Sequence, residues 1–459
     1  MPVPVYGEEG EIASAAEPLA ASINYSAFAK ATELKSRIWF TLGALVIYRL
    51  GTYIPIPGID PTILQDVFSR NAGGILGMFD MFSGGALGRM TIFALNIMPY
   101  ISASIIIQLL TAVSPTLEAL KKEGESGRKK LNQYTRLGTV LLAAVQSYGI
   151  AVGLEGMRAG AQSAVLDPGL FFRLVTVVTL TSGTVFLMWL GEQITARGIG
   201  NGISLIIMSG IVANLPHALA ATLELGRTGA LSTVFIIGFL VMAVAVVGFI
   251  VFMERAQRRI LVQYPKRQIG NRMFGGDASH LPLKINTSGV IPPIFASSLL
   301  LLPATVANFE ANGQSFGWLG EITAYLAHGR PLYMALYIAL ICFFSFFYTA
   351  IVFNPTETAD NLRKYGGFIP GIRPGKNTAD YLDYILTRLT VVGAAYLSAV
   401  CILPEILISE YSVPFYFGGT SLLIVVSVTM DTVAQIHSHL LAHQYEGLIK
   451  KAKLRGRRG

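Results

Sequence analysis

Long apolar runs separated by shorter polar segments dominate the pattern along this chain. A helix needs about 20 mostly apolar residues to cross the hydrocarbon core of a bilayer. Ten runs qualify as membrane spans, at Ile38–Ile54, Ile92–Val113, Leu137–Leu154, Leu170–Leu190, Ile199–Ala221, Leu231–Met253, Gly289–Ala307, Leu332–Phe353, Leu389–Ile408 and Phe415–Ile436. The pattern predicts an all-α polytopic membrane protein with ten transmembrane helices.

The composition of the 459 residues supports this fold class. Hydrophobic residues make up 53% and charged residues only 14%, whereas a soluble globular chain carries roughly 25% charged residues. Soluble enzymes, coiled coils and disordered chains are therefore poor fits. Both cysteines, Cys342 and Cys401, lie inside apolar runs, so no disulfide framework is expected.

The positive charges predict the orientation in the membrane. Among the loops that the ten spans define, 28 of the 35 Lys and Arg residues fall on one side and five on the other. Cytoplasmic loops carry the excess of positive charge, so both termini are expected in the cytoplasm. Residues 1–37 are acidic at their start and lack the apolar core of a secretory signal.

Ten spans divide into five plus five, and an odd number per half makes the second half enter the membrane in the opposite sense, as in an inverted repeat. The expected units are an N-terminal segment 1–37, a first five-helix half 38–221, a second half 222–436 and a basic tail 437–459. Segments 254–287 and 354–387 of the second half are too polar to be buried in lipid and longer than a short connection needs. They suggest a cytoplasmic docking surface, or they serve only to set the topology.

Signatures of catalysis are absent from the sequence. No Walker A or HExxH motif occurs, and the histidines at positions 437, 439 and 443 have no interleaved acidic or cysteine ligand. The spans contain almost no acidic residues of the kind that mark ion-coupled transporters. We expect no enzyme activity, no cofactor and no metal, so any energy must come from outside the chain.

Nine segments, in order from the first span to the last, resemble the bacterial SecY family, the channel subunit of the protein-export translocon. They are YIPIPGID (53–60), MFDMFSGGALGR (78–89), NIMPYISASIIIQLL (96–110), KKEGESGRKK (121–130), MWLGEQITARGIGNGIS (188–204), GVIPPIFASS (289–298), FNPTETADNL (353–362), PGIRPGK (370–376) and VPFYFGGTSLLIVV (413–426). The resemblance implies a bacterial inner-membrane protein with an hourglass channel between the two halves. Such a channel passes unfolded polypeptide and opens sideways to release apolar segments into lipid.

In that family a ring of apolar side chains constricts the channel midway. The resemblance maps it onto Ile97 and Ile101 in the second span, Ile203 and Ile207 in the fifth, Ile294 in the seventh and Ile424 in the tenth. Two pairs are spaced i, i+4, so each pair shares one helix face. A narrow ring of aliphatic side chains dewets and blocks small ions. Without the resemblance, this spacing indicates only core packing.

Residues 72–88 are apolar, interrupted by glycines and centred on Asp80, and are too short and irregular to span. In the family this region forms a short re-entrant helix that plugs the outer funnel at rest. The plug residues that this implies are Ile75, Leu76, Met78, Phe79, Met81, Phe82 and Ser83. An ordinary outer loop would instead leave the methionines and phenylalanines in water. Paired glycines at 73–74 and 84–85 would supply hinges.

The family opens toward lipid between spans two and three on one side and seven and eight on the other. The polar residues near this lateral gate are Gln108, Thr111, Asn286, Ser297 and Ser298. Hydrogen bonds between the helices on either side of this apolar seam would hold it closed. Breaking each of them would cost only about 1–2 kcal/mol, so the seam could still open. The alternative is that these residues make purely structural bonds between helices.

In the family the two long cytoplasmic loops bind the motor ATPase SecA or the ribosome, through its RNA and proteins, one at a time. The basic residues available for docking are Arg255, Arg258, Arg259, Lys266, Arg267, Arg272, Arg363, Lys364, Arg373 and Lys376. Arg373, flanked by proline and glycine in PGIRPG, is the expected central contact. The resemblance also implies a heterotrimer with SecE and SecG and contacts with signal sequences, nascent or preprotein chains and membrane lipids, with SecDF and YidC as further candidates.

Two other classes of protein remain open from the residues alone. A secondary transporter is also built from inverted repeats, but it should carry a mid-bilayer charged or broken-helix site. An insertase or scaffold would lack a pore.

Overall fold

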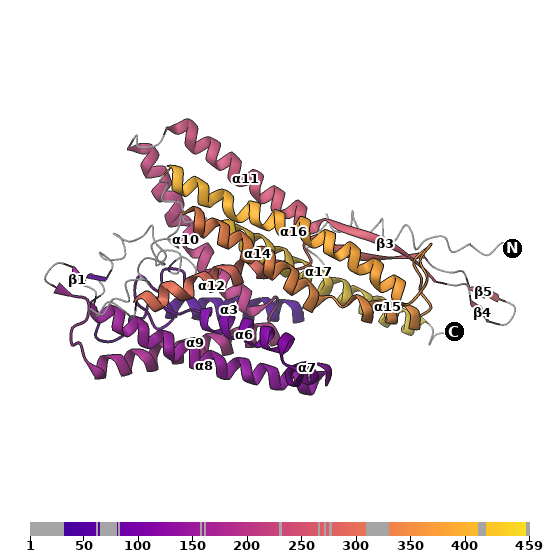
Figure 1. Ribbon diagram of the computed structural model, residues 1–459, viewed down its shortest axis with the longest axis horizontal. Coiled ribbons are helices and arrows are strands. Elements are labelled where there is room, and N and C mark those ends of the chain that lie inside the picture. The colour runs from indigo at the N-terminus through magenta and orange to yellow at the C-terminus, as the bar shows by residue number, and fades with distance from the viewer. Residues whose placement is uncertain are drawn as a thin grey trace.

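The computed structural model describes residues 32–60, 63–64, 80, 83–156, 158–159, 162–228, 232–264, 267–269, 272–274, 278–308, 330–411 and 419–455. Long helices lie side by side along the long axis of the molecule (Figure 1). They are α3 (Thr32–Gly51), α6 (Met98–Val113), α8 (Glu125–Gly156), α9 (Leu170–Arg197), α10 (Gly202–Arg227), α11 (Thr233–Arg255), α12 (Ile291–Asn308), α14 (Pro331–Val352), α16 (Lys376–Tyr411) and α17 (Gly419–Arg455). Each predicted span overlaps one of these helices.

The ten-span prediction is only partly confirmed by length and hydropathy. Within the described ranges seven helices are long and apolar enough to cross a bilayer, and eight if the bent pair α6 and α7 (Pro115–Lys122) counts as one span. By the same measure α12 is a shorter apolar helix over Ile291–Leu300.

Several helix ends differ from the predicted span ends. The second span was expected from Ile92, but α6 begins at Met98, because Pro99 occupies its first turn and Asn96 has a positive φ of 50°. Residues 376–387, expected in a loop, form the start of α16, and α17 continues through the expected tail to Arg455. Hydropathy marks where lipid ends, whereas polar residues of good helix propensity continue a helix into water.

The segment 254–287, expected as a long cytoplasmic loop within a helical fold, contains β-strands. Strands β3 (Gln257–Gln263) and β6 (Ala278–Lys284) form an antiparallel hairpin in which Ile260 pairs with Leu281. At its tip β4 (Arg267–Ile269) pairs with β5 (Arg272–Phe274). A smaller ribbon, β1 (Arg158–Ala159) with β2 (Gln162–Ser163), lies between α8 and α9. Period-two alternation along β3 and β6 buries one face of the hairpin, which favours strands over helix.

The remaining polar segment, 354–387, also has regular structure. It contains α15 (Pro355–Lys364), which packs on α16. Asn354 caps α15, because its Oδ1 accepts hydrogen bonds from the amides of Thr356 (3.1 Å) and Glu357 (3.3 Å).

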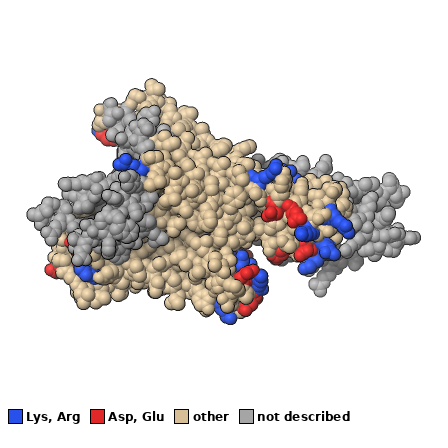
Figure 2. Space-filling model, in the orientation of Figure 1, with Lys and Arg blue, Asp and Glu red and all other residues tan. Residues whose placement is uncertain are grey.

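The two predicted halves meet where α10 contacts α17 and α12 contacts α6 and α8. Figure 2 shows charged side chains gathered toward the ends of the molecule, around α7 and beside β3 and α15, with an uncharged surface between. Large apolar side chains are exposed on the long helices, among them Trp39 of α3 (72%) and Val234 and Val244 of α11 (80% and 73%). An exposed apolar surface of this extent fits contact with lipid or another membrane protein.

Candidate functional site

The six isoleucines predicted to form the pore ring belong to one apolar cluster. Ile97 and Ile424 are each 1% exposed, and Ile101 and Ile207 are each 6% exposed. Ile203 and Ile294 are partly buried and pack against the same cluster. Residues separated by up to 327 positions therefore meet at the junction of α6, α10, α12 and α17.

The turn that begins α6 positions the first two isoleucines. Ile97 caps the helix, and the Ile101 amide donates to the Ile97 carbonyl at 3.1 Å, so the pair is one helical turn apart. Pro99 fits this first turn because the amide it lacks would have no intrahelical partner there. The i, i+4 spacing thus gives the shared face that was expected.

The start of α10 positions Ile203 and Ile207. Asn201 caps the helix by accepting hydrogen bonds from the amides of Ile203 (3.1 Å) and Ser204 (3.4 Å). At Gly202 a Cβ atom would lie 2.0 Å from the Gly191 carbonyl oxygen, so only glycine lets α10 start this close to α9.

The other two isoleucines also lie in the first turns of their helices. Ile294 follows Pro292 and Pro293 in the first turn of α12, and Ile424 lies in the second turn of α17. At Gly419, where α17 begins, a Cβ atom would lie 1.9 Å from the Val400 carbonyl oxygen. Close backbone contact between α16 and α17 therefore fixes the position of Ile424.

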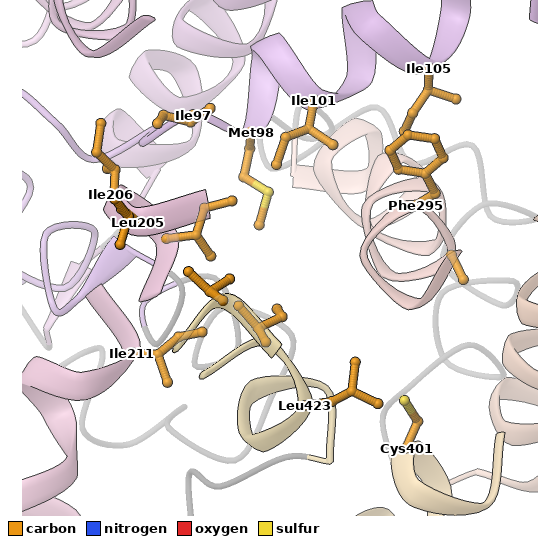
Figure 3. Packing of buried hydrophobic residues seen from close by; sticks show 14 of the residues in the cluster. Ile97, Met98, Ile101, Ile105, Leu205, Ile206, Ile211, Phe295, Cys401 and Leu423 are labelled. Carbon is orange, nitrogen blue, oxygen red and sulfur yellow. The ribbon is translucent and has the colours of Figure 1, made fainter. Parts of the chain in front are cut away.

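Other apolar side chains complete the cluster. Figure 3 shows Ile97 and Ile101 with Leu205 of α10, Phe295 of α12 and Leu423 of α17. These members are as buried as the ring itself, with exposures of 3% for Leu205 and 0% for Leu423. An apolar cluster of this kind offers ions no polar partner.

Most of the predicted plug residues, from Ile75 to Phe82, lie outside the described residues, but its C-terminal end is described. Asp80 Oδ1 accepts a hydrogen bond from the Gly88 amide at 2.6 Å, and Ser83 Oγ donates to the Asp80 carbonyl at 3.0 Å. Burial raises the pKa of the Asp80 carboxyl, and the Gly88 hydrogen bond opposes that rise. Gly84 and Gly85 have positive φ angles of 68° and 82°, as glycines at a sharp bend do.

Three side chains hold this end of the plug segment. The Tyr48 hydroxyl donates to the Ser83 carbonyl at 3.3 Å, and Arg49 Nη1 and Arg89 Nη2 each donate to the Gly84 carbonyl at 3.2 Å. The two guanidinium carbons also lie 5.7 Å and 4.4 Å from the centre of the Tyr53 ring, within cation–π range.

Seven of the ten predicted docking residues are exposed. Arg255, Arg258 and Arg259 are exposed on and just before β3, while Arg363, Lys364, Arg373 and Lys376 are exposed in the segment 354–387. Arg267 and Arg272 belong to the β4–β5 hairpin, and Lys266 lies outside the described residues.

A model of the SecY family matches residues 91–433, which is three quarters of the chain. The chain belongs to the SecY family. Protein translocase subunit SecY of Rickettsia conorii is 58% identical over 424 residues, covering 92% of this chain and 97% of that protein. The protein of the same name from Escherichia coli K12 is 57% identical over 424 residues, covering 92% and 96%.

Solved structures show the same fold at low sequence identity. One, described as the structure of a protein conducting channel, has a TM-score of 0.64 at 18% identity and covers 88% of this chain and 92% of its own. Another, Sec61 in a canine ribosome–channel complex from the endoplasmic reticulum, has a TM-score of 0.61 at 18% identity with the same coverage.

The predicted lateral gate of this SecY-family chain lies where α12 contacts α6 and α8. Of its polar residues, Ser298 reaches across the seam, with its Oγ 3.9 Å from Met98 Sδ. The hydroxyls of Thr111 and Ser297 bond carbonyls within their own helices. Asn286 Nδ2 instead donates to Glu254 Oε1 at 2.7 Å, which joins the ends of α11 and α12.

Gln108 and Thr111 line a cavity of about 500 Å³ between α6, α7, α8 and α14. Gln108 Nε2 donates to Ser104 Oγ at 3.2 Å, while its buried Oε1 has no hydrogen-bond partner. Glu118, Lys121 and Arg128 also line this cavity. This part of the seam is loosely packed and polar, in contrast to the tight isoleucine cluster.

Sequence reasoning missed two features. The partner of Arg49 is a backbone carbonyl 35 residues away, for which no side-chain pattern exists. The β3–β6 hairpin did leave a signal, because Ile260 and Val262 alternate with polar residues and Leu281 and Leu283 are spaced by two.

Proposed function

We propose that this SecY-family chain forms a protein-conducting channel in the bacterial inner membrane, with the six isoleucines as its constriction. The convergence of Ile97, Ile101, Ile203, Ile207, Ile294 and Ile424 in one cluster at the meeting of both halves supports this role most directly. A dry aliphatic ring blocks ions at rest and binds no passing side chain tightly. The chain itself is the conduit and is not an enzyme.

The finer assignments rest on family membership together with local geometry. Residues 72–88 act as the plug, anchored at Ser83 and Gly84, and the seam of α12 against α6 and α8 acts as the lateral gate. Both termini lie in the cytoplasm, on the side of the basic hairpin and α15. SecE and SecG complete the heterotrimer, and SecA or a ribosome docks on the basic surface.

Removing the plug tests the channel. The variant lacking residues 74–84 and the unaltered chain, each with its partner subunits, are reconstituted in planar bilayers for conductance and in proteoliposomes for export. We expect the deletion to raise resting ion conductance while export of an unfolded secretory protein continues. An unchanged conductance would overturn the plug assignment.

The same membranes separate the channel from a secondary transporter. A channel conducts ions without a coupled solute once its plug is gone, whereas a transporter stays closed to ions and needs a solute gradient. Deletion of residues 162–163 in the β1–β2 ribbon serves as the control, because it shortens another turn and leaves the plug anchor intact. Equal leaks in both deletions would point to general damage and count against the proposal.

A further inference from the structure

The two long cytoplasmic segments are joined by a backbone pair. The Gln263 amide donates to the Phe368 carbonyl at 2.9 Å, and the Phe368 amide donates to the Gln263 carbonyl at 2.9 Å. This antiparallel bridge links the end of β3 to the turn after α15. The hairpin and the second segment are therefore hydrogen-bonded neighbours.

A separate apolar core lies beneath that bridge. Ile260, Val262 and Leu283 on one face of the hairpin are 6%, 2% and 3% exposed. They cluster with Ile369 of the second segment and Leu382 of α16, which are 4% and 0% exposed. This cluster is distinct from the one at the constriction, so it can hold the two segments together independently of the channel.

The contact between the segments is tight at Gly367. A Cβ atom there would lie 2.9 Å from Tyr264 Cε1 and 3.2 Å from Val262 Cγ1. The hairpin side chains thus rest directly against the backbone of the second segment, and a larger residue at Gly367 would require them to shift.

The Arg373 tip, the PGIRPG motif at 370–375, begins three residues after Gly367. The Ile372 amide donates to the Ile369 carbonyl at 3.1 Å, and Thr378 Oγ1 donates to the Arg373 carbonyl at 3.1 Å. These bonds tie the tip to Ile369, which is part of the shared core, and to the start of α16. Arg373 itself remains exposed.

From these contacts we propose that the β3–β6 hairpin positions the Arg373 tip, and that hairpin and tip form one rigid platform that stays closed while polypeptide is driven through the channel. Val262 and Tyr264 are positioning residues, because they act on the tip through Gly367 and Ile369. The hairpin and the tip together form one surface, to which the acidic partner binds. This inference rests on the proposed function, in which Arg373 contacts the driving partner.

A disulfide across the bridge tests rigidity. Residues that exchange both backbone hydrogen bonds in an antiparallel pair have Cα atoms about 5.5 Å apart, which is within disulfide reach. We therefore introduce Gln263→Cys and Phe368→Cys in the complete complex with Cys342 and Cys401 replaced by alanine. We expect the disulfide to form readily and the oxidised complex to export within about twofold of the reduced one. Failure of the bond to form, or loss of export that a reductant restores, would overturn the rigid platform.

Val262→Asp tests positioning, and Leu261→Asp is its matched control on the opposite face of the same strand, where Leu261 is 37% exposed. We expect Val262→Asp to raise at least tenfold the motor concentration needed for half-maximal export, with conductance of the plug-deleted channel unchanged. The control should behave like the parent. Oxidising the 263–368 cysteine pair in the Val262→Asp chain should restore export, which general misfolding would not allow.

Arg373→Glu distinguishes the inference from the function on which it rests. Normal export by the Arg373→Glu variant would contradict the proposed docking role of Arg373, on which the inference rests. Blocked export by Arg373→Glu, combined with equal behaviour of Val262→Asp and Leu261→Asp, would overturn the platform alone.

Discussion

Arg49 is a charged residue inside an apolar run, and its partners are a backbone carbonyl and an aromatic ring. Arg49 ends α3 inside an apolar run, yet its guanidinium reaches the Gly84 carbonyl and the Tyr53 ring. The fit is close, because a Cβ atom at Gly84 would lie 2.6 Å from Arg49 Nη1. The charge thus fixes the end of the plug segment against α3.

Replacing Arg49 with methionine should loosen that end of the plug. A hydrogen bond to a charged group contributes about 1.5 kcal/mol, which corresponds to roughly a tenfold shift from closed to open. Single-channel recording should show resting openings about ten times more often than in the parent. The control is Arg37→Met, which removes an arginine paired with Glu33 on the same helix. Equal opening in the two variants would contradict the anchor.

At this scale the sequence predicted residue identities better than their partners. The six isoleucines were placed by family resemblance, with the spacing of two pairs as a check, and the structure brings them into one cluster. The partners of the predicted gate residues could not be predicted in this way. A polar side chain in a helix can donate to a carbonyl of its own preceding turn, as Thr111 does to the Ile107 carbonyl. No sequence pattern distinguishes that bond from one across a seam.

Glycines at the contacts between helices set the positions of whole elements. Gly183 of α9 packs against the turn before α6, where a Cβ atom would lie 2.0 Å from the Ile92 carbonyl oxygen. That turn leads directly into Ile97, so the packing of α9 bears on the isoleucine cluster.

Gly183→Ala should therefore destabilise the folded protein. Overpacking of a close contact costs about 1–3 kcal/mol, and a lower thermal unfolding midpoint in detergent would report it. Gly43→Ala is the matched control, since nothing lies within 4 Å of a Cβ atom at that helical glycine. There alanine should stabilise slightly, by about 0.5–1 kcal/mol. A Gly183→Ala midpoint at or above that of Gly43→Ala would refute this account.

The cavity beside α6 leads to a prediction about the gate. Gln108→Leu removes a buried oxygen that has no partner and should stabilise the closed seam by about 1 kcal/mol. Model segments of graded hydrophobicity should then need to be more apolar before they leave the channel for the membrane. Gln133→Leu, at an exposed glutamine of α8 outside the cavity lining, is the control. An unchanged threshold in Gln108→Leu would exclude a gate role for this residue.

The sequence predicted the helices whose residues are apolar enough to lie in lipid. Apolar runs located the helices, but α16 and α17 extend well beyond lipid-length segments into polar sequence. The hairpin in 254–287 was missed because charge, rather than alternation, dominated the interpretation of that segment. Its strands are stabilised by packing on the segment 354–387, and such a contact is not visible in local sequence.

At the scale of the whole molecule, charge and apolar surface are segregated. Basic residues gather beside β3 and α15, and the surface between the charged ends shows few charged side chains (Figure 2). Large apolar side chains are exposed on the long helices. The isoleucine cluster joins α6, α10, α12 and α17, and a second apolar cluster lies between the β3–β6 hairpin, the segment 354–387 and α16.

The central claim is that polypeptide passes through the isoleucine cluster, and crosslinking to a stalled secretory chain tests it most directly. Single cysteines replace Ile101 or Ile294, and a third variant carries cysteine at Val244, which is 73% exposed on α11. We expect a chain arrested partway to crosslink to positions 101 and 294 and not to 244. Crosslinks at 244 alone, or none at 101 and 294 while export proceeds, would contradict it.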